Sequence, residues 1–337
     1  MTSAFPATRR RGSIAALCIL AAIGLQSCGK SGFQEGWTGL RADAIDHLAV
    51  SVPTVALGVN TTKAPGLAGV HAFSSLAGAR PRIVMWYQTW AEPLFYPEQV
   101  RSLLREGLIP MINWQPTAAH GAGRYSLTAI ADGAFDSYIR RSARAAARWG
   151  HPMFIDFAHE MNIGGTAWSP GVEGNTPGAY VRAWRHVVRI FRAAGADRVR
   201  WLWAPNVDCG GACPFSQFYP GDAWVNWVGL DGYNSGAGSK SRWTEFEEEF
   251  GPSYEALTRL TGKPVMIAET ASSEAGGDKA TWILNMARAL ETRFTRVRAL
   301  VWFDRQKEHD WRINSSSASL AAFQQAMKMP PFSQAAQ

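Results

Sequence analysis

Eight short runs of apolar, β-branched or aromatic residues recur along the chain, and longer segments with helical spacing separate them. The runs are Val55–Val59, Ile83–Gln88, Ile109–Trp114, Met153–Glu160, Arg198–Ala204, Asn226–Asp231, Pro264–Glu269 and Arg296–Phe303. Buried parallel strands appear as continuous apolar runs, and an intervening helix returns the chain to the start of the next strand. Eight such repeats predict a (β/α)8 TIM barrel.

The segments between the runs carry helix start and stop signals. One begins at Asn175-Thr176-Pro177, which combines a capping residue with a proline in the first turn, and it stops at Gly195. Others start after Tyr96 and near Asp278, and a last one is expected over Ser317–Met327. The strands and helices extend from Val55 to Met327, a span of 273 residues that is close to the length of about 250 typical of one such barrel.

A doubly wound open sheet is the alternative fold. It usually has a glycine-rich phosphate-binding turn after its first strand, whereas only Asn60-Thr61-Thr62-Lys63 follows Val59. No break in composition suggests a second domain. We therefore expect a single catalytic domain over residues 50–330 and a tail over residues 331–337.

The N-terminus has the features of an export signal. Arg9, Arg10 and Arg11 precede an apolar run from Ser13 to Leu25, which is too short to span a bilayer comfortably. The following Leu25-Gln26-Ser27-Cys28-Gly29 resembles a bacterial lipobox, so we expect a signal peptide over residues 1–27, lipidation at Cys28 and a tether over residues 28–49. A plain signal peptide or an uncleaved anchor is the alternative. Either way, we expect an exported protein that is membrane-anchored in the periplasm or at the cell surface, or else secreted.

The formal net charge of +7 gives little support to nucleic-acid binding. The signal segment contributes +3 of it, and the mild remainder is accompanied by no nucleic-acid-binding motif. Export also affects the cysteines, because Cys209 and Cys213 can close a Gly-rich loop as a disulfide in an oxidising compartment. Free thiols or a metal site are the alternatives. No other cysteine or nearby histidine supplies further metal ligands.

Two glutamates end otherwise apolar runs at the positions where a barrel carries its chemistry. Glu160 ends the fourth run and Glu269 the seventh, so the two carboxyl groups are expected to face each other across the barrel. A half-buried carboxylate is costly unless it is paired or has a function. Two carboxyl groups on opposite sides of a pocket are what cleavage of a glycosidic bond requires, with one protonated and one ionised.

Several motifs at the strand ends together resemble glycoside hydrolase family 26, the β-mannanase family of the clan of retaining (β/α)8 glycosidases. They are Phe157-Ala158-His159-Glu160-Met161-Asn162, Trp203-Ala204-Pro205-Asn206, Phe218-Tyr219-Pro220-Gly221-Asp222, Trp227-Val228-Gly229-Leu230-Asp231-Gly232-Tyr233-Asn234 and Ile267-Ala268-Glu269-Thr270. The resemblance covers roughly residues 50–330.

The resemblance implies roles for individual residues. Glu160 would be the general acid/base and Glu269 the nucleophile, while Tyr233 would orient Glu269 and His159 would bind sugar hydroxyls. Trp302 would form an apolar platform under the reacting sugar, and Trp168 would line the site near the point of cleavage. The chain has 15 tryptophans, and Trp86 and Trp114 at other strand ends are further candidate sugar platforms. No cofactor or metal is implied, and we expect a monomer whose partner is the polysaccharide.

Two positions depart from the family pattern as it is known. Asp156 stands where a basic residue often precedes the acid/base by four, and Ile163 stands where Gly often follows the Asn. Ile163 also excludes the zinc-protease motif, which needs a histidine four residues after His159. We expect a retaining endo-β-1,4-mannanase. A β-1,3-1,4-glucanase or β-1,3-xylanase of the same family is the alternative, and a non-catalytic carbohydrate-binding lipoprotein is the alternative of another class.

Overall fold

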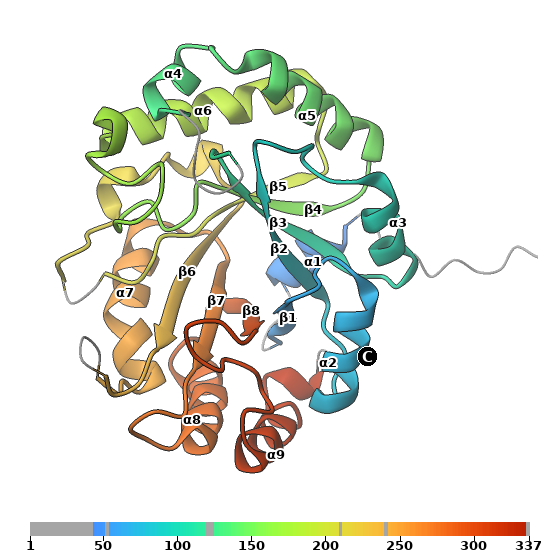
Figure 1. Cartoon of the computed structure of the whole chain (residues 1–337), viewed down its shortest axis with the longest axis vertical. Helices are drawn as coiled ribbons and strands as arrows, with labels where there is room; N and C mark the ends of the chain where they lie inside the picture. Colours follow the sequence, from blue (N-terminus) through green and yellow to red (C-terminus); the bar gives the residue numbers. More distant parts are fainter. Residues whose placement is uncertain (1–42, 51–53, 119–124, 209–210, 239–241, 335–337) are drawn as a thin grey trace, which may run out of the picture. The chain divides into compact units, whose positions relative to one another are not determined.

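The protein folds as a closed barrel of eight parallel strands surrounded by helices (Figure 1). The computed structural model describes residues 43–50, 54–118, 125–208, 211–238 and 242–334. The strands pair in chain order, and the eighth closes the ring on the first. They are β1 (Ala56–Thr61), β2 (Ile83–Thr89), β3 (Ile109–Gln115), β4 (Met153–Phe157), β5 (Val199–Trp203), β6 (Trp227–Asn234), β7 (Val265–Ser272) and β8 (Val297–Asp304). The predicted (β/α)8 fold is confirmed.

The helices begin where their capping residues predict. Thr176 accepts a hydrogen bond from the backbone N–H of Ala179 at 3.1 Å with Pro177 in the first turn, and Asp278 caps the helix that follows it. Each cap satisfies a backbone N–H that has no partner within its helix. The helices are α1 (Ala44–Val50), α2 (Leu67–Ala77), α3 (Pro97–Arg105), α4 (Leu127–Ala131), α5 (Asp136–Trp149), α6 (Pro177–Ala193), α7 (Phe246–Leu260), α8 (Lys279–Thr292) and α9 (Ser317–Ala326).

The start of the folded domain lies earlier than predicted. Residues 44–49 were expected to belong to the tether, but α1 buries Ala44, Ile45 and Leu48 against residues inside the barrel. Asp46 also pairs with the Arg200 guanidinium near the start of β5, with the two N–O distances at 2.7 and 2.5 Å. The apolar face of α1 therefore belongs to the domain. At the other end, Phe332 of the predicted tail is 5% exposed and also packs into the core.

Two apolar layers hold the barrel together. The lumen contains side chains such as Ile83, Met111 and Leu202, and alternate residues of the same strands pack outward under the helices. Side chains that alternate along a strand point to opposite faces, so each strand position is either lumenal or outward. Within the described ranges, no helix is both long and apolar enough to cross a bilayer. The predicted signal segment and Cys28 lie outside the described residues.

Candidate active site

An irregularity in β7 turns Glu269 into the barrel. Leu230 and Asp231 on β6 pair with Ile267 and Glu269, so Ala268 is an extra residue in β7. On the other side of β7, Ile267 pairs with Leu300 of β8 and Thr270 pairs with Trp302. Ala268 and Glu269 therefore both lie opposite the single residue Val301. A β-bulge of this kind changes which face the following side chain points to. Ala268 packs with the lumenal residues, and Glu269 points inward as well.

Glu269 is held by three donors from three different strands. Its Oε2 accepts hydrogen bonds from the hydroxyls of Tyr87 at 2.6 Å and Tyr233 at 2.5 Å, and its Oε1 accepts one from Nδ2 of Asn113 at 2.6 Å. Only 3% of Glu269 is exposed. The predicted contact of Tyr233 with Glu269 is present, whereas Tyr87 and Asn113 were not predicted to belong to the site.

The pKa of Glu269 reflects opposing effects. Burial and, to a smaller extent, the negative charge of Glu160 raise it, whereas the hydrogen bonds from Tyr233 and Tyr87 lower it, and the net result is a pKa of about 7. Hydrogen bonds donated to a carboxylate favour its ionised form. Because the charge of Glu160 raises the pKa of Glu269, the protonation states of the two carboxyl groups are linked.

The backbone before Glu160 leaves the strand earlier than predicted. The fourth run was expected to extend to Glu160, but β4 ends at Phe157, and both Ala158 and Glu160 have a left-handed backbone with φ of 52° and 51°. That conformation is uncommon for residues other than glycine and occurs at functional sites. Backbone hydrogen bonds to the neighbouring strands stabilise it, since Ala158 N donates to Trp114 O and Glu160 N to Ala204 O.

Glu160 is partly exposed, and its carboxyl group accepts a hydrogen bond from Asn206. Its Oε1 accepts a hydrogen bond from Nδ2 of Asn206 at 2.8 Å. Asn206 is itself positioned by Asn162, whose Oδ1 accepts from the backbone N–H of Asn206 at 2.9 Å. Burial raises the pKa of Glu160, and the hydrogen bond from Asn206 and the charge of Lys307 lower it.

His159 and Trp168 lie next to each other at the edge of this site. The indole Nε1 of Trp168 donates to the backbone carbonyl of His159 at 2.7 Å, and the two ring centroids are 5.6 Å apart. The His159 ring also lies 5.7 Å from that of Tyr87. Burial lowers the pKa of His159 to about 4, so the ring is neutral near pH 7. Its Nδ1 is buried without a hydrogen-bond partner, so it has a polar atom left for a ligand.

The structure corrects the prediction for three of the tryptophans. Trp86, Trp114 and Trp302 occupy outward positions on their strands and are at most 3% exposed. Trp114 packs against Trp90 and Phe191, and Trp302 against Phe323 of α9. These indoles fill the layer between the barrel and its helices, so they do not offer a face on which a sugar could stack.

A tryptophan after β8 contacts a residue of the site, although only 2% of it is exposed. The ring of Trp311 lies 5.2 Å from that of Tyr233, and its backbone carbonyl accepts a hydrogen bond from Nε1 of Trp302 at 3.0 Å. Trp302 thus supports the loop that carries Trp311. Trp168, which was predicted to line the site near the point of cleavage, lies beside His159 and is only 3% exposed.

Two further acids lie buried under the glutamates. Asp156 on β4 and Asp231 on β6 are completely buried, and none of their carboxyl oxygens has a hydrogen-bond partner of normal geometry. Burial raises the pKa of each well above its usual value, and the charge of Glu269 raises it further. The protonated, neutral form of both side chains is therefore favoured more than it is in an exposed aspartate. At Asp156, where the chain departs from the family pattern, burial thus opposes a negative charge.

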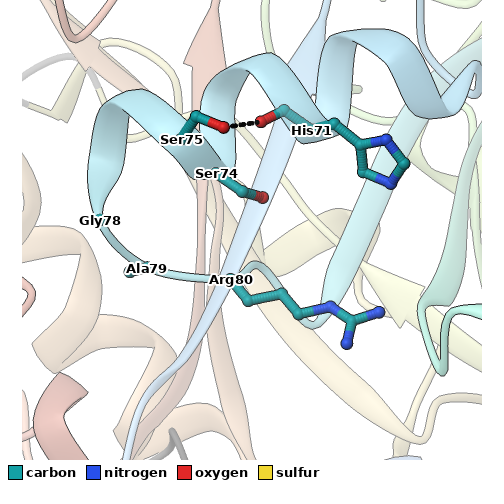
Figure 2. Close-up of a pocket in the computed structure, with 6 residues that line it drawn as sticks. All are labelled: His71, Ser74, Ser75, Gly78, Ala79 and Arg80. Atoms are coloured by element: carbon teal, nitrogen blue, oxygen red, sulfur yellow. Dashed lines mark hydrogen bonds between the residues drawn. The ribbon is translucent and has the colours of Figure 1, made fainter.

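Other candidate features do not contribute to this site. The predicted partner of Cys213 is Cys209, which lies outside the described residues, so that disulfide stays a prediction. No group of three or more His, Cys, Asp and Glu side chains in the described ranges is arranged to hold a metal ion. A surface hollow of about 460 Å³ lies at the C-terminal end of α2, lined by His71, Ser74, Ser75, Gly78, Ala79 and Arg80 (Figure 2). It is near the beginning of β2, at the opposite end of the barrel from the glutamates.

Comparison with known proteins supports a glycoside hydrolase, the class that the sequence motifs resemble. The sequence profile of glycosyl hydrolase family 26 matches residues 136–295. Endoglucanase H of Acetivibrio thermocellus is 35% identical over 269 residues, which cover 78% of this chain and 29% of that relative. The chain thus spans less than a third of that relative's length.

Solved structures share the fold at low sequence identity. A modular endo-β-1,4-mannanase from Cellulomonas fimi has a TM-score of 0.68 and 18% identity, with 88% of this chain and 76% of that chain covered. An endo-β-1,4-mannanase catalytic domain from a Bacillus species has a TM-score of 0.64 and 16% identity, with 86% and 90% covered. The fold and the paired glutamates define a barrel of the glycoside hydrolase class. The chain belongs to glycosyl hydrolase family 26.

Proposed function

We propose that the chain is a retaining β-glycanase that works by double displacement, with Glu269 as nucleophile and Glu160 as acid/base. The observation that carries this proposal is the unequal bonding of the two carboxyl groups. Glu269 accepts three hydrogen bonds and Glu160 accepts one. Burial raises the pKa of Glu269 to about 7, but its three donors stabilise the anion and Glu160 has only one, so we assign the proton shared by the pair to Glu160.

The first step forms a bond between an oxygen of Glu269 and the anomeric carbon of the reacting sugar. The bond from that carbon to the leaving oxygen breaks, and Glu160 donates its proton to that oxygen. Loss of this proton makes Glu160 negative. In the second step, Glu160 takes a proton from water, the water oxygen attacks the anomeric carbon, and the bond to Glu269 breaks. Two inversions leave the β configuration unchanged.

Two observations bear on the substrate class, and they favour different polymers. The relative that is 35% identical is named an endoglucanase, which favours a β-glucan such as a mixed-linkage β-1,3-1,4-glucan. The family resemblance favours β-1,4-mannan, and the structural neighbours named as mannanases are 14–18% identical. The higher identity makes β-glucan the first substrate to test and mannan the second. A β-1,3-xylan is the remaining polymer of the family alternatives.

The remaining proposals concern the location of the enzyme. We propose export with lipid attachment at Cys28 and a polysaccharide as the partner. Growth of the producing cells with a radiolabelled fatty acid tests this, because label should enter the full chain and not a Cys28→Ser variant. Label in both variants, or in neither, contradicts lipidation at that residue.

The function is tested by incubating the purified enzyme with lichenan, mannan, cellulose and β-1,3-xylan and sizing the products over time. A rapid fall in polymer length supports endo action, and release of only short sugars supports exo action. Glu160→Ala should reduce turnover by about 10²–10⁴-fold, the usual contribution of a general acid/base. Glu269→Ala should reduce it by at least about 10⁴-fold. Binding without turnover by the wild-type chain would favour the non-catalytic alternative.

A further inference from the structure

Lys279 is a completely buried cation on the outside of the barrel, at the first residue of α8. Its ammonium donates to the backbone carbonyl of Arg312 at 2.8 Å, to Oγ of Ser315 at 2.8 Å and to the carbonyl of Asp310 at 3.3 Å. All three acceptors belong to the loop between β8 and α9. The three donors of the ammonium are thus directed at one loop.

This position is unfavourable for a positive charge. Burial of a cation is costly, and the N-terminus of a helix repels positive charge. Burial lowers the pKa of Lys279 to about 8, against the opposing effect of the acids around it. The charged groups that face it are Glu274, Asp304, Asp310 and Arg312. A methionine or leucine would fill the same space without this cost, so the ammonium has a role that an apolar side chain lacks.

The loop that Lys279 holds carries two groups that act on the active site. Trp311 contacts the ring of Tyr233, whose hydroxyl donates to Glu269. The charge of Lys307 lowers the pKa of both Glu160 and Glu269. The same loop is also fixed by a hydrogen bond from the backbone N–H of Ile313 to Oδ1 of Asp304 at 2.8 Å.

We propose that Lys279 is a positioning residue for the hydrolytic reaction: it holds the β8–α9 loop so that Trp311 keeps Tyr233 against Glu269. The chain of contacts runs from the ammonium to the loop carbonyls, from Trp311 to Tyr233, and from the tyrosine hydroxyl to the nucleophile. This inference rests on the proposed function, because its effect on catalysis is measured through the activity of that site. The effect of Lys279 on the loop is measured without reference to enzymatic activity.

The test replaces Lys279 by Met, which keeps the length of the side chain and removes the charge and all three donors. Lys328→Met is the matched control, because Lys328 is exposed at the end of α9. We expect kcat per folded molecule to fall between about 10- and 100-fold, the scale of a small displacement near the reacting groups. KM for a long polymer should change little, since most of its contacts lie beyond the reacting sugar. Lys279→Arg, which keeps a charge and donors, should recover part of kcat.

The pH profile separates positioning from a purely structural role. The titratable groups that face Glu269 are Tyr87 on β2, Asp156 on β4, Glu160 after β4, Asp231 and Tyr233 on β6, and Lys307 after β8. Of these, Lys307 moves with the loop. The acid limb of kcat/KM should therefore shift to higher pH in Lys279→Met, whereas a lower folded fraction alone scales the profile without moving it.

Hydrogen exchange of the full chain gives a result that does not depend on activity. Backbone amides of residues 305–316 should exchange faster in Lys279→Met than in wild type, with amides of β3 and β4 unchanged. If Lys279→Met does not fold, Ser315→Ala removes one acceptor and should give a smaller change in the same direction. Unchanged exchange and unchanged kcat in the folded variant overturn the inference. A wild-type chain that cleaves no glycan contradicts the proposed function instead, while the exchange still decides whether Lys279 holds the loop.

Discussion

The hydroxyl of Tyr233 lies 2.5 Å from Oε2 of Glu269, and the hydroxyl of Tyr87 reaches the same oxygen from the other side at 2.6 Å. Two phenols on one carboxylate oxygen leave the second oxygen to Asn113. The tyrosines come from β2 and β6, so the barrel itself fixes the direction of the carboxylate. Groups held on rigid strands are better positioned than groups on loops.

Removal of either hydroxyl should impair turnover. A hydrogen bond to a charged group contributes about 1.5–3 kcal/mol, so Tyr233→Phe and Tyr87→Phe should each lower kcat/KM by about 10- to 100-fold. Because these bonds favour the ionised carboxylate, the acid limb of the pH profile should move upward. Tyr180→Phe is the control, since its hydroxyl bonds the carbonyl of Phe157 on the outside of the barrel. Steady-state kinetics from pH 4 to 9 checks this, and an unchanged profile in both tyrosine variants contradicts it.

Asn206 should affect the alkaline limb of the pH profile of kcat/KM. Its hydrogen bond lowers the pKa of Glu160, which must be protonated to act as an acid. Asn206→Ala should therefore raise the pKa of Glu160 and move the alkaline limb of kcat/KM to higher pH. A limb that moves to lower pH, or stays where it is, shows that another group is the acid.

Asp156 should make the stability depend on pH. Its pKa is raised in the folded state, so its contribution to stability is present below its unfolded pKa and is lost as pH rises through the folded value. Asp156→Asn removes this titration. As the pH is raised from 5 to 9, the stability of Asp156→Asn should therefore increase relative to that of wild type, as measured by thermal unfolding. A difference between the two proteins that is the same at both pH values contradicts a raised pKa.

Trp114 should matter for stability and not for substrate binding. It is fully buried under α5 and α6, where replacement of a large aromatic by alanine costs about 3–5 kcal/mol. Trp114→Ala should lower the free energy of unfolding in urea by that amount. The milder Trp114→Phe should keep the wild-type KM, whereas a raised KM would restore this residue as a sugar platform.

Much of this arrangement follows from the sequence, and the parts that do not have physical reasons. Apolar runs predicted all eight strands, and their ends drew attention to Glu160 and Glu269. Strands of a closed parallel barrel are buried on both faces, so apolar residues do not show which face is lumenal. For this reason Trp86 and Trp114 were assigned to the site, while their neighbours Tyr87 and Asn113 were not.

The direction of Glu269 also could not be predicted from alternation. Counting from the lumenal Met266 and Ala268, an unbroken strand would turn Glu269 outward, and the register shift in β7 reverses this. The left-handed backbone at Glu160 is similar, since its sequence context has no glycine to announce it. Both irregularities depend on pairing with neighbouring strands, which a single sequence does not reveal.

The configuration of the first product tests the central claim most directly. A cello- or manno-oligosaccharide that the enzyme cleaves is hydrolysed in an NMR tube, and the anomeric proton of the new reducing end is followed before mutarotation. Double displacement by Glu269 and Glu160 predicts that the β anomer appears first and the α anomer grows only later. An α anomer that appears first would contradict the assignment of Glu269 as a covalent nucleophile.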